Sequence, residues 1–311
     1  MSENLQVKKY EILFLYESTY SIPNRDPFTG EQRYDDETKK VLVSDVRIKR
    51  FIRDYFVDKG TEDIFVINDK SALEAGGEKL KGSGAALRML TLKKKYTDDS
   101  VKTNDKISAV KIMQKCIDVR LFGGISTEGG DAVNLTGAVQ FALLNPSLNS
   151  VDLRIHQNTS VFSSSEEKSR GAIGTTTVVP YSLNQIHGWI NPYSAKHTGL
   201  NEEDVQKMFK ALWESINNAN TRTKSNQNSL LLLQIVYAEP NKKLYGIDRT
   251  IKLETDKRDE QIRNSDDYAL DLTEFTKAVN DDAVSSVNFY TEKSALENQL
   301  SNLPKFAKMD L

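Results

Sequence analysis

The sequence predicts an α+β fold, and three observations lead to this class. Aromatic and aliphatic runs at residues 8–17 and 230–239 are typical of buried strands. Two other segments, 44–56 and 202–218, repeat apolar residues every three or four positions, which is typical of amphipathic helices. Once the long polar insertions are set aside, the elements follow in the order strand, helix, strands, helix, strand. This order is compatible with a split β-α-β (ferredoxin-like) core.

The first predicted helix has one apolar face and one basic face. Ser44 is a good N-cap, and Asp45 suits the first turn. The apolar residues are Ile48, Phe51, Ile52 and Tyr55, and the basic residues are Arg47, Lys49, Arg50 and Arg53. Such a line of cations suits a phosphate backbone, and a solvated helix face is the competing interpretation. We expect at most one of these cations, Arg50 beside Asp54, to be held in an i,i+4 ion pair.

Residues 58–104 are predicted to form an insertion, because a glycine cluster and a lysine run lie there between polar stretches. Gly77 and Gly82 have the separation found in a phosphate-binding loop. Ser83, however, stands where that motif requires lysine, which argues against nucleotide binding. The elements expected after the insertion are a helix at 105–117, a strand at 132–144 interrupted by Gly137, a helix near 268–280 and a short strand near 286–290.

Two β-prone stretches, 151–162 and 172–183, are joined by a wholly polar link and predict a long hairpin with a solvated tip. Val161 and Phe162 lie at the base of that tip, where an apolar pair needs a partner. A wedge that unstacks nucleic-acid bases is one use for such a pair. A contact with a neighbouring subunit would explain the same residues.

The charge balance argues against a protein that is basic overall. The chain has 311 residues, with 42 basic against 44 acidic side chains and a net charge of −2. The basic residues nevertheless cluster at 47–53 and 79–95, and the acidic ones gather after Glu254. A nucleic-acid surface would therefore be local, with acidic surface elsewhere for contacts between copies.

No catalytic or metal-binding motif stands out. The single cysteine, Cys116, excludes an internal disulfide and a multi-cysteine zinc site, and its apolar neighbours predict a buried thiol. The three histidines are scattered, and neither H-E-x-x-H nor G-x-S-x-G occurs. No apolar run is long enough to cross a bilayer, and the N-terminus lacks the pattern of a secretory signal. We therefore expect a cytoplasmic protein with no cofactor, metal or membrane partner.

Four segments taken together resemble one known family, the Cas-seven-type backbone subunits of type I CRISPR Cascade complexes, subtype I-B branch. The segments are the loop Asn24-Arg25-Asp26-Pro27 after the first strand, the Ser-led basic helix VSDVRIKRFIR with its Lys49-Arg50 pair, the D-x-x-LFG element at 118–123, and the run TTTVVPYSLNQIHGWINPYSAKHTGLNEEDV. They cover roughly residues 8–56 and 117–238. Their order and spacing make the resemblance specific.

The resemblance implies one elaborated domain over residues 1–311, with an RNA-recognition-like (RRM-like) palm. The finger-like insertion would be 58–104, and the thumb would be the β-hairpin at 156–178. Copies of such subunits stack along a guide (CRISPR) RNA, and each thumb flips out one base. The other bases stay free to pair with target DNA. The implied partners are guide RNA, target DNA through the guide, further copies of the chain, and the large, Cas-five-type and small Cascade subunits.

The resemblance also implies roles for particular residues. Guide phosphates would be contacted by Ser44, Arg47, Lys49, Arg50 and Arg53, with Asn24 and Arg25 in the neighbouring loop. Gly123 and Gly124 would permit close approach of the backbone to RNA, and Val161 and Phe162 would act at the thumb. The alternative is a type III-like backbone subunit that cuts target RNA with a metal ion at Asp26. A DNA-binding regulator is disfavoured, because no helix-turn-helix pairing stands out.

Overall fold

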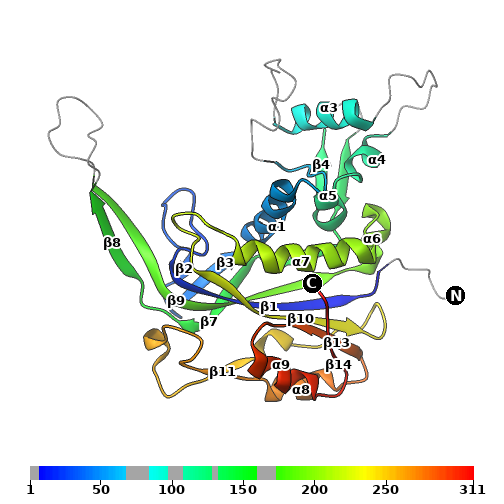
Figure 1. Cartoon of the computed structure of the whole chain (residues 1–311). Helices are drawn as coiled ribbons and strands as arrows, with labels where there is room; N and C mark the ends of the chain where they lie inside the picture. Colours follow the sequence, from blue (N-terminus) through cyan, green and yellow to red (C-terminus); the bar gives the residue numbers. More distant parts are fainter. Residues whose placement is uncertain (1–6, 68–83, 97–107, 128–131, 160–172) are drawn as a thin grey trace, which may run out of the picture.

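The computed structural model describes residues 7–67, 84–96, 108–127, 132–159 and 173–311. Within these residues, ten strands form one sheet through the middle of the molecule (Figure 1). The order along the sheet is β14 (Phe306–Lys308), β13 (Val284–Tyr290), β10 (Gln227–Tyr237), β1 (Tyr10–Ser21), β9 (Ile173–Ile190), β7 (Leu144–Ser150), β3 (Lys40–Ser44) and β2 (Tyr34–Asp35). Two further strands, β6 (Val139–Phe141) and β8 (Arg154–Thr159), pair with β9. The large sheet, together with the helices that cover it, confirms the predicted α+β class.

The centre of the sheet is the pair of strands that the sequence marks most clearly. β1 lies antiparallel to β10 on one side, with Tyr10 opposite Val236, and antiparallel to β9 on the other, with Tyr10 opposite Ile190. Most of β1 and β10 is buried. Both faces of these strands are covered by other elements, which is why their apolar residues run continuously instead of alternating with polar ones.

Two amphipathic helices cover one face of the sheet, α1 (Asp45–Lys59) and α7 (Glu202–Asn217) (Figure 1). Both predicted helices are confirmed. Ser44 caps α1 by accepting a hydrogen bond from the backbone N–H of Arg47, and Gly60 ends the helix in the left-handed conformation. The apolar residues of both helices pack with inward-facing residues of β1, β9 and β10 in the main core; from the helices these include Ile48, Phe51, Ile52, Val205, Met208, Phe209 and Leu212.

A second core lies on the opposite face of the sheet. It is built under α8 (Thr273–Val279) and α9 (Ser294–Ser301), beside the small two-stranded sheet of β11 (Lys252–Glu254) and β12 (Ala269–Asp271). Two 3₁₀ turns, η2 (Ile247–Arg249) and η3 (Asp259–Gln261), complete this layer. The helix and the strand predicted near 268–280 and 286–290 correspond to α8 and β13.

A third, smaller core lies beyond α1 and joins α3 (Gly84–Tyr96) to α4 (Ala109–Met113) and to the two-stranded sheet of β4 (Gly123–Ser126) and β5 (Val133–Thr136). The helix predicted at 105–117 is divided between α4 and α5 (Ile117–Phe122), with Cys116 at the N-cap of α5. The strand predicted at 132–144 is likewise divided into β5, β6 and the start of β7. The short helix α6 (Pro192–Thr198) links β9 to α7.

The predicted hairpin pairing is confirmed. β8 pairs antiparallel with the first part of β9, from Arg154 opposite Val178 to Thr159 opposite Ile173. This two-stranded ribbon projects away from the rest of the sheet (Figure 1). β9 then continues to Ile190 and becomes a central strand, so the hairpin is a direct extension of the core. Val161 and Phe162 lie outside the described residues.

Candidate nucleic-acid interface

The loop between β1 and β2 is tied to the start of α1 by Asn24. The Asn24 side chain is buried (5% exposed), and its Oδ1 accepts a hydrogen bond from the backbone N–H of Ser44 (2.6 Å). The Asn24 backbone N–H donates to Oε1 of Gln32 (2.9 Å). A buried amide whose groups are paired internally has little left for a ligand. The structure therefore gives Asn24 a positioning role, and a direct contact with RNA stays a prediction.

Arg25 is exposed at the outer side of this loop. Its Nε donates to the carbonyl oxygen of Gly30 (2.6 Å), so the guanidinium lies across the turn. Gly30 has φ +76°, and a Cβ there would lie 2.7 Å from Nη2 of Arg25. The positive φ favours glycine at this position, and a larger residue would displace the Arg25 side chain. The loop therefore holds Arg25 in a defined position.

Asp26 is committed to the same turn. Its Oδ1 accepts hydrogen bonds from the backbone N–H groups of Phe28 (2.9 Å) and Thr29 (3.2 Å), and its Oδ2 is 2.9 Å from Nη1 of Arg33. The hydrogen bonds from Phe28 and Thr29, helped by the charge of Arg33, lower the pKa of Asp26. The turn leaves the Phe28 ring 97% exposed. An exposed aromatic ring is a surface on which bases of single-stranded nucleic acids stack.

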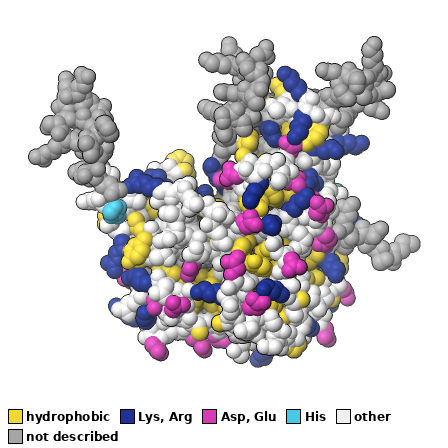
Figure 2. Space-filling view, in the orientation of Figure 1, with side chains coloured by type: hydrophobic (Ala, Val, Ile, Leu, Met, Phe, Trp, Pro, Cys, Tyr) yellow, Lys and Arg dark blue, Asp and Glu magenta, His cyan; other side chains and the backbone are white. Residues whose placement is uncertain are grey.

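The cations of α1 are more often paired than the sequence predicts. Lys49 lies 3.1 Å from Asp45, Arg50 lies 3.1 Å from Asp54, and Arg53 lies 3.0 Å from Asp118. The expectation of at most one such pair is wrong. Lys49 and Asp45 have i,i+4 spacing along the helix, and Asp118 reaches Arg53 from α5, which no local pattern reveals. The mixed charge is visible in Figure 2, where basic and acidic side chains alternate over the middle of the face.

Arg47 differs from the other cations of α1. No aspartate or glutamate of the described segments lies within ion-pair distance of it. Its guanidinium stacks on the Phe51 ring (3.7 Å from guanidinium carbon to ring centroid), and its buried Nε has no hydrogen-bond partner there. Burial lowers the pKa of Arg47. A buried donor without a partner is costly, so this guanidinium is ready to receive an acceptor.

Lys224 lies beside Arg47, although the sequence gives no sign of it. It sits in the polar loop between α7 and β10, and its side chain is buried (7% exposed). Its Nζ donates to the carbonyl oxygen of Ile22. Burial, with the positive charges of Arg47 and Arg25, lowers the pKa of Lys224 to about 7. A single lysine in a polar loop belongs to no periodic pattern or motif. Its position beside Arg47 therefore could not be predicted from the sequence and is seen only in the fold.

A cavity of about 410 Å³ opens between α1 and the 218–224 loop. Its lining includes Arg47, Phe51 and Tyr55 from the helix and Asn218, Thr221 and Lys224 from the loop. A second hollow, of about 640 Å³, lies along α1 beside Val46, Arg50 and Arg53. Cavities therefore border α1 on both sides: one at Arg47, which has no carboxylate partner among the described residues, and one at Arg50 and Arg53, which are paired with Asp54 and Asp118.

The two predicted glycines serve the packing of the chain itself. Gly123 has φ +76°, and a Cβ there would lie 2.1 Å from the carbonyl oxygen of Leu135 and 2.5 Å from the nitrogen of Gly137. A Cβ on Gly124 would lie 3.0 Å from Cε of Met113. The close backbone approach that requires glycine is thus the approach of β4 to β5 and its following turn. Approach to RNA at Gly123 and Gly124 stays a prediction.

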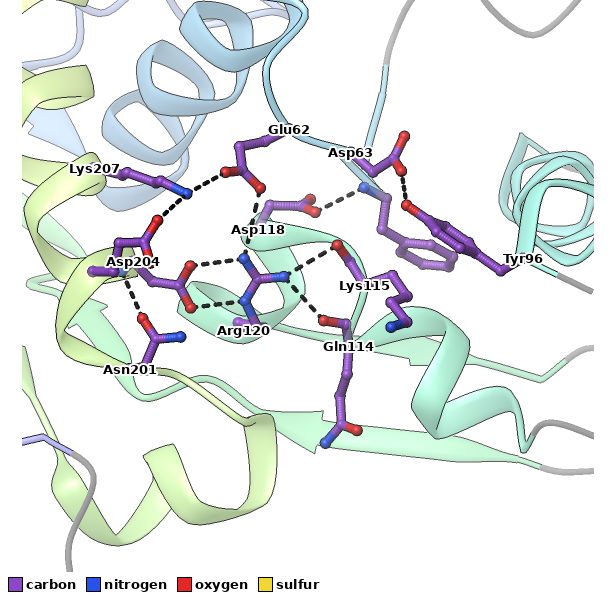
Figure 3. A network of polar contacts seen from close by, with 12 residues as sticks. Glu62, Asp63, Tyr96, Gln114, Lys115, Asp118, Arg120, Asn201, Asp204 and Lys207 are labelled. Carbon is purple, nitrogen blue, oxygen red and sulfur yellow. Dashed lines mark hydrogen bonds and ion pairs between the residues drawn. The ribbon is translucent and has the colours of Figure 1, made fainter.

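The D-x-x-LFG element anchors the third core to the main one (Figure 3). The Asp118 carboxylate is buried (1% exposed) and accepts hydrogen bonds from the backbone N–H groups of Phe65 (2.7 Å) and Val66 (3.0 Å). Arg120 binds both carboxylate oxygens of Asp204 on α7, each at 2.7 Å. A bidentate pair of this kind fixes orientation as well as position. Asp118 and Arg120 therefore join α5 to the segment after α1 and to α7.

The described residues show neither a metal-ligand cluster nor a reactive thiol. In the ranges that the structure describes, no three His, Cys, Asp or Glu side chains gather as metal ligands would. The Cys116 thiol is buried, and burial raises its pKa to about 12, which keeps it protonated and unreactive. None of the described helices combines the length and apolar character needed to span a membrane.

Comparison with known proteins identifies relatives over most of the chain. The family model of CRISPR-associated protein Cas7 matches residues 8–273. A curated Haloferax volcanii protein with the same description is 26% identical over 294 residues, which is 88% of this chain and 83% of that protein. The fold is similar to chains of two solved structures, a CRISPR RNA-guided surveillance complex and a pre-nicking form of such a complex. Each has a TM-score of 0.55 and 14% identity over 97% of this chain, and the match covers 95% and 96% of those chains respectively.

Proposed function

The chain belongs to the Cas7 family of CRISPR-associated proteins, and from that premise we propose that it is the backbone subunit that holds guide RNA in a type I Cascade surveillance complex. The four motifs quoted from the sequence favour subtype I-B. The proposed partners are guide RNA, target DNA paired to it, further copies of the chain and the other Cascade subunits. The proposed compartment is the cytoplasm.

One observation carries the RNA-binding part of this proposal. Where the β1–β2 loop meets α1, Arg25 and Arg47 have no carboxylate partner among the described residues, while Lys49, Arg50 and Arg53 are paired. Uncompensated cations form the kind of surface that binds the phosphates of single-stranded nucleic acid, and the exposed Phe28 ring, in the same loop as Arg25, can stack on a base.

The palm, finger and thumb arrangement belongs to the same proposal. The core strands follow the sheet order β10-β1-β9-β6, with α1 and α7 on one face, and this order supports an RRM-like palm. The finger would contain α3 within 58–104, and the thumb would be the β8–β9 hairpin within 156–178. At the thumb, Val161 and Phe162 would separate stacked bases.

We assign no catalytic step to this chain. Asp26, the residue that a type III-like nuclease would use, is held by two backbone N–H groups and by Arg33. The assembled complex should therefore leave complementary RNA intact in the presence of Mg²⁺. Regularly spaced cuts that disappear in the Asp26→Ala variant would contradict this assignment.

The main experiment is to produce the tagged chain together with a CRISPR array and its neighbouring subunits, and to analyse what it purifies with. We expect a short RNA of uniform length and the other subunits in fixed proportion. The Arg47→Ala variant should retain less of that RNA. A wild-type chain that purifies without RNA under these conditions would overturn the proposed function.

A further inference from the structure

The buried Lys224 ammonium has no carboxylate partner among the described residues. Its ammonium donates to the carbonyl oxygen of Ile22, a neutral partner. The charges that act most strongly on it are both positive, Arg47 from α1 and Arg25 from the β1–β2 loop. Within the described part of the chain, no carboxylate pairs with any of these three side chains. Three cations from three segments therefore converge without compensation.

Asp54 lines the same cavity and its charge acts on Arg47, but none of the charged groups around the cavity lies within ion-pair distance of Lys224 or Arg47 among the described residues. Asp54 is paired with Arg50 (3.1 Å), and Lys59 lies 3.7 Å from Glu214, to which Tyr55 also donates. Asp58 is exposed at the rim of the cavity. The buried hydroxyl of Tyr16, which acts on Arg47, has its pKa raised by burial and stays neutral near pH 7.

Burying Arg47 and Lys224 close to each other without a carboxylate is unfavourable, and a bound anion would relieve that repulsion. The cavity beside Arg47 and Lys224, about 410 Å³, has room for a phosphate group. The unpartnered Nε of Arg47 supplies a donor, and the ammonium of Lys224 can supply more. A phosphodiester offers the acceptor oxygens and the single negative charge that these groups require.

We propose that Lys224 and Arg47, which line this cavity, form a seat for one phosphodiester group of single-stranded RNA, with the charge of Arg25 acting from the β1–β2 loop, and that Lys224 takes up a proton from solvent when that phosphate binds. This inference rests on the proposed function and deepens it. It adds Lys224, from the loop after α7, to the RNA interface and makes RNA affinity dependent on pH.

The sign of the pH dependence follows from the charges. In the free protein, burial and the two arginines lower the pKa of Lys224 to about 7. A bound phosphate opposes the repulsion from Arg25 and Arg47 and raises that pKa. Below pH 7, Lys224 is already protonated and RNA affinity is independent of its titration. Above pH 7, binding must recruit a proton, so affinity falls as pH rises, on the order of tenfold between pH 6.5 and 8.5.

Calorimetry on the full-length chain tests the proposal. A 12-nucleotide oligouridine is titrated at pH 8 in two buffers of different ionisation enthalpy, Tris and HEPES, which gives the number of protons taken up. This pH lies above the ordinary range of histidine titration. We expect close to one proton for the wild-type chain and close to none for Lys224→Arg, whose guanidinium is always charged. Lys224→Arg should also keep its affinity at pH 8.5, whereas Lys224→Met should bind weakly at every pH.

Lys242→Met is the matched control, because Lys242 is exposed in the loop beyond the other end of β10. Its proton uptake should equal that of the wild-type chain. Wild-type binding without proton uptake, or uptake that persists in Lys224→Arg, would overturn the proton-linked seat while leaving RNA binding intact. Absence of RNA binding by the wild-type chain at every pH would overturn both the seat and the proposed function. Thermal unfolding of each variant establishes that it is folded before titration.

Discussion

Replacing Asp118 by asparagine tests whether Arg53 serves the scaffold or the RNA. The Asp118 carboxylate accepts hydrogen bonds from Phe65 and Val66 N–H and from Nε of Arg53 (3.0 Å), all in a buried site. A carboxamide keeps one acceptor oxygen, turns the other into a donor and removes the counter-charge of Arg53. Breaking a buried pair from one side costs about 3–5 kcal/mol. We expect Asp118→Asn to lower the free energy of unfolding by about 3 kcal/mol.

Urea unfolding followed by circular dichroism measures that loss, and hydrogen exchange at the Phe65 amide reports it locally. Asp54→Asn is the control, because Asp54 also pairs with an arginine of α1, but both partners are half exposed. Its effect should stay below about 1 kcal/mol. If Arg53 serves the scaffold, the salt dependence of RNA affinity should be unchanged in Asp118→Asn, because Arg53 then makes no phosphate contact that the substitution could alter. Equal stability losses in the two variants would refute the reasoning.

Two other substitutions separate ligand contacts from scaffold contacts. Arg47→Ala should reduce the slope of log affinity against log salt by about 0.7, the value for one phosphate contact on a single strand. Lys49→Ala should leave the slope unchanged because Asp45 already holds Lys49. Anisotropy titrations that give the same slope for both variants would contradict the assignment of Arg47 to the phosphate and Lys49 to the scaffold. Gly123→Ala should cost about 3 kcal/mol, since its φ of +76° suits only glycine and the new Cβ would meet β5. Gly174→Ala, with nothing within 4 Å of its Cβ position, should leave the melting temperature unchanged, and a similar loss in both would refute the strain argument.

The elements that sequence predicted well are those whose signal is local. Each of these signals is carried by residues close together in the sequence. Examples are the apolar stripe of α1, its Ser44 cap and the apolar run of β10, which contains Gln234. The helix expected at 105–117 is wrong in extent: residues 105–107 lie outside the described residues, α4 ends at Met113, and α5 begins at Ile117 with Cys116 as its N-cap. Its apolar periodicity continues through that break, so pattern alone could not locate it.

The candidate site was harder to predict because its character depends on contacts between distant segments. Arg53 pairs with Asp118 across 65 positions, an ion pair that its place on the helix does not reveal, and its contact with RNA stays a prediction. Lys224 shows the opposite case, an unremarkable lysine in a polar loop that the fold buries beside Arg47. Local sequence gives the sign of a charge, and only the tertiary structure shows what neutralises it.

The difference between paired and unpaired cations on α1 also explains how a chain with a net charge of −2 can hold RNA. Cations that are paired with carboxylates contribute little long-range field: Lys49 pairs with Asp45 within α1, and Arg53 pairs with Asp118 and so ties α1 to α5. The proposed binding surface then consists of the few cations that have no carboxylate partner among the described residues, chiefly Arg25, Arg47 and Lys224. Because each is held by the backbone or by packing before RNA arrives, little side-chain entropy is lost on binding. A fixed guide conformation requires such preorganised contacts more than it requires a high total charge.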